Sequence, residues 1–115
     1  MPKPKPGEVW LVRFAFTELT STKVRPALVL ADHRQDLIVL GIFLKVPAGV
    51  LPETWVLIEE THPEFGQTGL KKTSSIRAEK IATVYESVFQ RQLGRLPSDM
   101  MEQVQKALKK ALRIP

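Results

Sequence analysis

The spacing of apolar residues changes once along this 115-residue chain, and that change limits the folds that the chain can adopt. Before residue 85, short segments rich in Val, Leu, Ile and aromatic residues are separated by Pro, Gly or polar turns. From Ser98 onward, apolar residues recur at helical spacing, at Met101, Val104, Leu108 and Ala111. Short strands followed by one amphipathic helix predict a β-rich α+β fold, in which a C-terminal helix packs on a small, curled antiparallel sheet.

The apolar segments predict five strands, over residues 8–14, 26–31, 37–46, 55–58 and 74–84. The third segment is apolar on both faces and is therefore expected to lie in the centre of the sheet. The fifth alternates less regularly, which is typical of a strand with a bend. Ser98 or Asp99 is the expected N-cap of the helix, and Pro115 closes the chain.

Length and composition favour a single domain over residues 1–115, with a flexible Pro- and Lys-rich leader over residues 1–6. The chain has no Cys, which excludes disulfides and thiolate metal sites. No apolar run approaches the roughly 18 residues that a membrane span needs, and the leader lacks the apolar stretch of a secretion signal. We therefore expect a cytoplasmic protein without a membrane partner. His33 and His62 are far apart, so we predict neither a metal nor another cofactor.

The chain carries 17 Lys and Arg against 12 Asp and Glu, a net charge of +5. A basic balance in a small domain favours nucleic acid or an acidic protein as a partner. A solvated basic surface explains the same balance equally well.

Arg25 and Pro26 stand where a hydroxyl-rich loop meets an apolar strand. A guanidinium in that place can bind phosphate in two-pronged fashion. The loop adds further phosphate ligands, namely the hydroxyls of Thr20, Ser21 and Thr22 and the charge of Lys23. Two plainer readings remain open: Arg25 ties the loop to the sheet by bonding its carbonyls, and the loop is only a polar turn.

Four segments, taken in order, resemble the PemK/MazF toxins, which cleave RNA in bacterial type II toxin–antitoxin modules. They are GEVW (residues 7–10), FAFTELTSTKVRPALVL (14–30), TGLKKTSSIRAEKI (68–81) and LGRL (93–96), the last followed by the helix. The second is similar to a subgroup pattern of the form F-x-F-T-D-L-S-x-S-K-x-R-P-A-L-V-L. The resemblance covers nearly the whole chain and implies an SH3-like β-barrel with a terminal helix.

The resemblance also implies an activity and partners. It implies an mRNA interferase that cleaves single-stranded RNA without a metal, through attack of the ribose 2′-hydroxyl on the adjacent phosphate, a route that DNA cannot take. It implies a homodimer that a cognate antitoxin inhibits, with operator DNA bound through the antitoxin complex.

Three residues match catalytic positions of the family. Arg25 matches the arginine of its Arg-Pro pair, and we assign it charge stabilisation because a guanidinium is a very weak acid and keeps its proton near neutral pH. Arg77 and Glu79 match an arginine and an aspartate, and residues two apart on a strand share a face. Glu79 as base and Arg77 as phosphate ligand is one reading, and a salt bridge between them is the other. We also predict RNA contacts for Lys45, Lys72 and Ser75.

Phe43 and Leu44 depart from the family pattern, because active relatives commonly carry a catalytic Thr, often followed by Ser, at the end of this strand. Neither side chain donates a hydrogen bond, and losing one transition-state donor typically costs about 10²–10³ in rate. The alternative is therefore a homologue that binds RNA, DNA or a protein without cleaving, in which Thr and Ser at these positions would restore cleavage. Phe16 and Trp55 are either base-stacking residues or core and dimer contacts.

Overall fold

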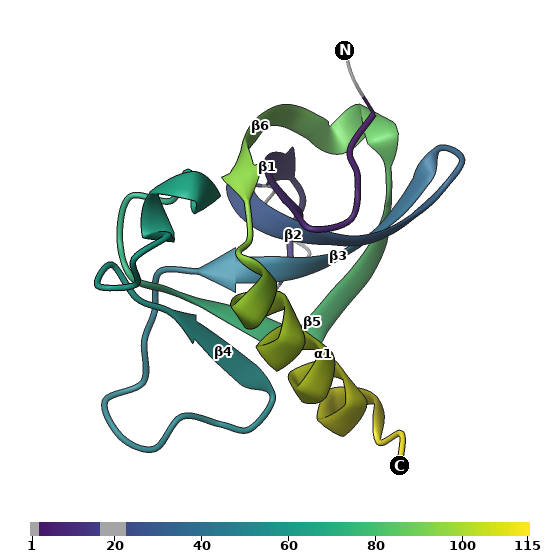
Figure 1. Cartoon of the computed structure of the whole chain (residues 1–115). Helices are drawn as coiled ribbons and strands as arrows, with labels where there is room; N and C mark the ends of the chain where they lie inside the picture. Colours follow the sequence, from purple (N-terminus) through teal and green to yellow (C-terminus); the bar gives the residue numbers. More distant parts are fainter. Residues whose placement is uncertain (1–2, 17–22) are drawn as a thin grey trace.

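The computed structural model describes residues 3–16 and 23–115 of the chain. Within them, six strands form one antiparallel sheet in the order β4-β5-β3-β2-β1-β6, and one α-helix packs on it (Figure 1). The strands are β1 (Glu8–Arg13), β2 (Val24–His33), β3 (Asp36–Phe43), β4 (Trp55–Ile58), β5 (Ser74–Tyr85) and β6 (Phe89–Arg95), and the helix is α1 (Ser98–Leu112). Two short 3-10 helices, η1 (Phe65–Thr68) and η2 (Glu86–Val88), flank β5. The predicted fold class is confirmed.

β3 lies inside the sheet, as its two apolar faces predict, because it pairs with β2 on one side and β5 on the other. Leu37, Val39 and Leu40 have no exposed surface. The strand is shorter than predicted, since it ends at Phe43, and the side chain of Leu44 is 69% exposed.

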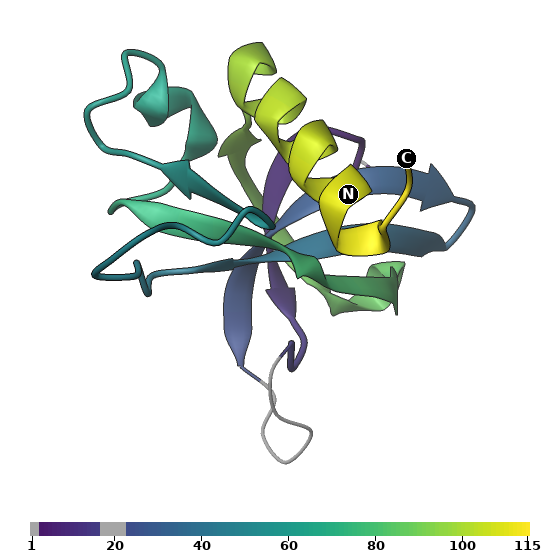
Figure 2. The same cartoon turned by 90° about the horizontal axis from the view of Figure 1, so that it is seen from below.

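The sheet curls strongly but does not close. Its register shifts between Val29 and Ala31 of β2, between Leu40 and Gly41 of β3, and twice along the β1–β6 pair. Such irregularities bend a strand and increase its twist, and the bend predicted for the fifth strand falls at one of them. The edge strands β4 and β6 do not pair with each other in the part of the chain described. Figure 2 shows the strands fanning out below α1.

The sixth strand, β6, is absent from the sequence prediction. Only Phe89 of the seven residues of β6 is buried. The strand continues with three polar residues in a row, and Gly94 comes two positions after them. β6 is an edge strand that pairs only with β1, so backbone hydrogen bonding rather than an apolar pattern defines it.

Of the predicted apolar positions of helix α1, Val104 is buried and Met101, Leu108 and Ala111 are partly buried. Met100, Val104 and Ala107 are buried at intervals of four and three residues, and they pack over β4 and β5. The predicted N-cap is wrong by one or two positions, since Pro97 occupies it without a side-chain cap. Asp99 in the first turn, and Lys109 and Lys110 in the last, suit the helix dipole.

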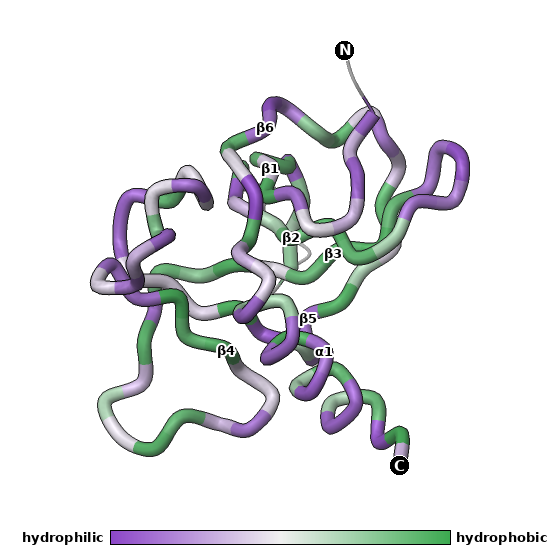
Figure 3. Tube along the Cα trace, in the orientation of Figure 1, coloured by the Kyte–Doolittle hydropathy of each residue, from purple (hydrophilic) through white to green (hydrophobic). Residues whose placement is uncertain are grey.

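The two faces of the sheet carry separate apolar clusters, and hydrophobic stretches run through the central strands in Figure 3. One cluster joins the sheet to α1 and is built on Val9, Leu28, Leu40, Ile76 and Val104. The other lies on the opposite face and includes Trp10, Ala27, Val29, Val39 and Phe89. Fully burying one Val or Leu side chain contributes about 1.5–3 kcal/mol, so both faces of the central strands stabilise the sheet.

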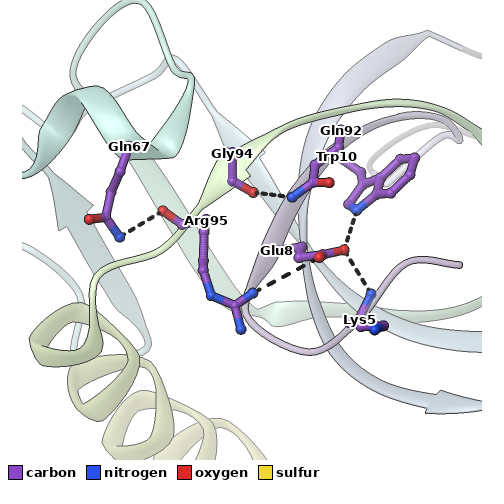
Figure 4. Close-up of polar contacts among 7 residues, drawn as sticks. All are labelled: Lys5, Glu8, Trp10, Gln67, Gln92, Gly94 and Arg95. Atoms are coloured by element: carbon purple, nitrogen blue, oxygen red, sulfur yellow. Dashed lines mark hydrogen bonds and ion pairs between the residues drawn. The ribbon is translucent and has the colours of Figure 1, made fainter. Parts of the chain in front are cut away.

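Glu8 ties the start of the chain to the sheet (Figure 4). Its Oε1 accepts hydrogen bonds from the backbone N–H of Lys5 and from the Trp10 indole, each at 2.9 Å, and Arg95 lies 4.0 Å from Oε2. The indole N–H of Trp10, a residue only 2% exposed, is therefore paired. Pro4 is also buried, while the flexibility that we predict for residues 1–6 stays a prediction.

In the described part of the chain, no helix is long and apolar enough to cross a membrane.

Gly94 marks a close approach between β6 and the segment after β4. A Cβ built at Gly94 would lie 2.1 Å from the carbonyl oxygen of Gln67. We expect Gly94→Ala to lower the free energy of unfolding by about 1–3 kcal/mol, because backbone must shift to admit the methyl group. Urea unfolding followed by circular dichroism measures the change.

Gly66→Ala is the matched control, since nothing lies within 4 Å of a Cβ at Gly66. Equal stability of the two variants would contradict the packing described here.

Candidate functional site

Four strands place the candidate catalytic residues in adjoining rows. The register aligns Ala27 of β2, Gly41 of β3, Arg77 of β5 and Trp55 of β4 across the sheet. Phe43 lies two residues beyond Gly41 and pairs with Ser75. Side chains two apart on a strand share a face, so β3 carries Phe43 to the same face as Arg77.

Arg25, Arg77, Phe43 and Trp55 form one group, which we call the aromatic–arginine stack. The Arg77 guanidinium carbon Cζ lies 4.2 Å from the centroid of the Phe43 ring and 4.1 Å from that of Trp55. Cζ of Arg25 lies 5.4 Å from the Phe43 centroid. All three distances fall within the roughly 6 Å over which a ring face attracts a cation.

Phe43 is 5% exposed, and its ring folds back over Gly41. A Cβ on Gly41 would meet Cε2 of Phe43 at 2.8 Å and Cγ of Phe16 at 3.0 Å, so the missing side chain makes room for both rings. Phe14, Phe16 and Phe43 follow one another in edge-to-face contacts. These contacts make Phe16 part of an aromatic cluster under the stack.

The two arginines repel each other at this range. The Cζ atoms of Arg25 and Arg77 lie 5.4 and 4.2 Å from the centroid of the Phe43 ring, so these two atoms are at most 9.6 Å apart. Two unit charges at that separation repel by on the order of 1–2 kcal/mol at an effective dielectric constant of about 20. Among residues 3–16 and 23–115, no carboxylate oxygen lies within 4.0 Å of either guanidinium. An anion bound between them would relieve this repulsion.

Arg77 also has a buried donor without a partner. Its Nε is shielded from solvent and makes no hydrogen bond within the described part of the chain. A buried unpaired donor costs about 1–3 kcal/mol in stability, and the attraction of two ring faces offsets part of that cost. The salt bridge between Arg77 and Glu79, one of the two sequence-based readings, is not formed within 4.0 Å in the described residues.

Glu79 instead accepts hydrogen bonds from Trp55, the first residue of β4, and from Thr54, the residue before that strand. Its Oε1 accepts a hydrogen bond from the Thr54 hydroxyl at 2.8 Å, and its Oε2 accepts one from the Trp55 indole at 2.9 Å. Burial works against ionisation, but the bonds from Thr54, from its own backbone N–H and from Trp55, together with the charge of Arg77, outweigh it and hold the pKa of Glu79 below its ordinary value. Glu79 is exposed and ionised at neutral pH.

A cavity of about 640 Å³ adjoins the aromatic–arginine stack, because Arg25 and Phe43 line it together with Lys72. Its cations are Arg25, Lys71, Lys72 and Arg91, and its apolar lining includes Leu11, Val24, Leu44, Leu70 and Leu93. Arg77 and Glu79 do not line it. Arg91 was missed from the sequence because it lies on β6, the strand whose pattern gave no signal.

The remaining predicted RNA ligands are dispersed. Lys23 and Lys45 are exposed and lie just before β2 and just after β3. Ser75 has no exposed surface, and its hydroxyl lies 2.8 Å from the Lys45 carbonyl and 3.4 Å from the Phe43 carbonyl. Its RNA contact stays a prediction that its burial does not favour, and the bonds indicate that it holds the end of β3.

Thr20, Ser21 and Thr22 lie outside the described residues, so their predicted contacts stay predictions. The reading in which Arg25 bonds the carbonyls of that loop stays open for the same reason. Within residues 3–16 and 23–115, the Arg25 guanidinium makes no hydrogen bond to a carbonyl.

His62, Glu64 and Asp99 are the one group in the described residues whose ligand atoms lie close enough for a metal, all within 4.8 Å. Both ring nitrogens of His62 already have partners: Nε2 lies 2.8 Å from Asp99 Oδ2, and Nδ1 accepts the Glu64 backbone N–H. The bond with His62 holds the pKa of Asp99 below its ordinary value. These contacts fasten the segment before η1 to the start of α1, which explains the cluster without an ion.

The chain matches one known protein family and a group of solved structures. A family model described as "PemK-like, MazF-like toxin of type II toxin-antitoxin system" matches residues 5–112. A comparison with curated protein sequences finds no match.

Solved structures match over nearly their whole length at low identity. An endoribonuclease from a mycobacterial species, in complex with its cognate antitoxin, is 20% identical with a TM-score of 0.75, covering 97% of each chain. The toxin MazF-mt6 of Mycobacterium tuberculosis is 18% identical with a TM-score of 0.73, covering 94% of this chain and 98% of its own. MazF from Deinococcus radiodurans is 19% identical with a TM-score of 0.73, covering 99% and 100%. At these identities the structures establish the shared fold.

The hydrogen bond from Thr54 is testable through the carboxyl group that it stabilises. We expect Thr54→Val to raise the pKa of Glu79 toward its ordinary value, because the variant removes a donor to the ionised form. A carbon-13 NMR titration of the Glu side-chain carboxyl signals measures it.

Thr83→Val is the control, an exposed threonine on the same strand as Glu79. An unchanged pKa in Thr54→Val, or an equal rise in both variants, would contradict the assignment.

Proposed function

The chain belongs to the family of PemK-like, MazF-like toxins of type II toxin–antitoxin systems, and from this membership we propose that it is a metal-independent endoribonuclease that cleaves single-stranded RNA. The observation that supports this most is the pair of guanidiniums on the Phe43 ring, with no carboxylate within 4.0 Å of either in the described residues. Two fixed cations suit a phosphodiester, because guanidinium groups bind phosphate strongly and remain charged at every physiological pH.

In the proposed reaction, the ribose 2′-oxygen forms a bond to the adjacent phosphorus, and the bond from phosphorus to the 5′-oxygen breaks. The 2′-proton passes to a base, and the 5′-oxygen takes up a proton as it leaves. The products are a 2′,3′-cyclic phosphate and a 5′-hydroxyl. Arg25 and Arg77 stabilise the charge that develops on the phosphate oxygens.

Glu79 is the proposed base. Its lowered pKa keeps the carboxylate ionised and able to accept a proton near neutral pH, although it makes the group a weaker base. Each carboxylate oxygen accepts one hydrogen bond and retains a further lone pair. Activity that depends on ionised Glu79 is lost as pH falls through a pKa below 4.5, so Glu79 imposes no acid limb between pH 5 and 8.

We also propose the biological setting from the family and its relatives. The protein acts on mRNA in the cytoplasm as a homodimer, and a cognate antitoxin inhibits it. A solved mycobacterial relative is described as an endoribonuclease in complex with its cognate antitoxin, and MazE-MazF complexes are known from Deinococcus radiodurans. Contact with operator DNA would come through the antitoxin complex.

Phe43 favours a second candidate function, a homologue that binds RNA, DNA or a protein without cleaving it. The side chain offers no hydroxyl to the transition state. Retention of RNA on the protein without new 5′-hydroxyl ends would favour this candidate over the nuclease.

Removing either arginine tests the nuclease directly. We expect Arg25→Ala and Arg77→Ala each to lower the cleavage rate of a mixed-sequence single-stranded RNA by about 10²–10³, the usual effect of losing one transition-state donor. The rate is measured by gel electrophoresis with and without EDTA, and the product ends are identified by mass spectrometry.

Lys106→Ala is the control, because it removes one positive charge from the exposed surface of α1. The proposal fails if wild-type protein leaves the RNA intact, if EDTA abolishes cleavage, or if the arginine variants cut as fast as the control.

A further inference from the structure

The Phe43 ring contacts two arginines. This position gives Phe43 a role that the family's sequence pattern does not indicate. The ring is buried, rests on Gly41, and has the guanidinium carbons of Arg77 and Arg25 at 4.2 and 5.4 Å from its centroid. β3 lies between β2 and β5, so the Phe43 ring contacts Arg25 from one neighbouring strand and Arg77 from the other.

Trp55 completes the surroundings of Arg77 from the other neighbouring strand. β5 lies between β3 and β4, so Phe43 and Trp55 approach Arg77 from strands on opposite sides. The hydrogen bond from the Trp55 indole to Glu79 fixes the plane of the ring. Stacking between ring faces suits the flat guanidinium of arginine, and the ammonium of lysine lacks this geometry.

We propose that Phe43 and Trp55 are positioning residues that hold Arg77, and through Phe43 also Arg25, as a two-guanidinium clamp for the scissile phosphate, without a hydroxyl donor. This inference rests on the proposed function and deepens it. It gives Phe43, which stands at the place of the family's catalytic threonine, a positioning role, and it makes Phe43 a requirement for activity.

Steady-state kinetics test the clamp. We expect Phe43→Leu, which keeps an apolar side chain but removes the ring face, and Phe43→Thr to lower kcat by about 10- to 100-fold, the usual result of misplacing a catalytic group by about 1 Å. The change in KM is smaller, since the clamp acts mainly on charge that develops in the transition state. Trp55→Leu has a similar effect, and Trp55→Phe, which keeps a ring but loses the hydrogen bond to Glu79, recovers part of the rate.

Arginine side-chain NMR supplies a readout that a general loss of packing would not reproduce. In protein labelled with nitrogen-15 arginine, the Arg77 Hε signal is expected upfield, because the proton lies near two ring faces. Phe43→Leu and Trp55→Leu each move it downfield, whereas Tyr85→Leu, which removes a half-exposed ring elsewhere on β5, leaves it in place. Dispersed backbone spectra verify that each variant is folded, and Phe43→Leu decides the outcome if Phe43→Thr does not fold.

Inorganic phosphate separates failure of this inference from failure of the proposed function. Even if wild-type protein does not cut RNA, the Arg25 and Arg77 Nε signals are expected to shift together on titration with phosphate, with one dissociation constant, and Phe43→Leu abolishes the joint response. The inference is overturned if Phe43→Thr cleaves as fast as wild type or faster, if Arg77 Hε is not upfield, or if the two signals respond independently.

Discussion

The pairing of β3 with β2 on one side and β5 on the other brings Arg25, Phe43 and Arg77 together, and the pairing of β4 with β5 adds Trp55. That register sets Gly41 beside Arg77 and leaves the Phe43 ring within reach of both arginines. A slip by one residue would exchange the faces of β3 and carry Phe43 away from the face that holds Arg77. The geometry of the site therefore depends on the stability of the sheet.

Electrostatics on this framework favour an anion. Arg25 and Arg77 are held close together, while the carboxylate of Glu79 is engaged by Thr54 and Trp55 and forms no close ion pair with Arg77. Two arginines on one aromatic ring, without a close carboxylate in the described residues, resemble the arrangement by which enzymes stabilise developing negative charge. The low pKa of Glu79 follows from the hydrogen bonds of Thr54, of its own backbone and of Trp55, and the last of these also orients the Trp55 ring.

Apolar spacing predicted much of the fold. The central place of β3 and the extent of α1 follow from residues such as Val39 and Val104, whose burial the periodicity anticipates. β6 escaped prediction because only Phe89 in it is buried, and the helix N-cap was misplaced because Pro97 starts the helix without a side-chain bond. Local pattern carries no information about pairing at a sheet edge.

The candidate site was predicted only in part. Alternation along β5 predicted that Arg77 and Glu79 share a face, and both residues contact Trp55. The sequence could not reveal the stacking on Phe43, because it depends on contacts between three strands. Nor could it reveal that Ser75 is buried, since a serine in a strand carries no mark of the carbonyls that it will meet.

A crystal structure with a single-stranded RNA that carries 2′-deoxy substitution at the cleavage position tests the central claim most directly, because this RNA binds but lacks the attacking hydroxyl. The account predicts one phosphate of the strand within about 2.7–2.9 Å of donors on both Arg25 and Arg77. A strand whose phosphates contact only Lys71, Lys72 and Arg91 in the neighbouring cavity, leaving Arg77 unoccupied, would contradict it.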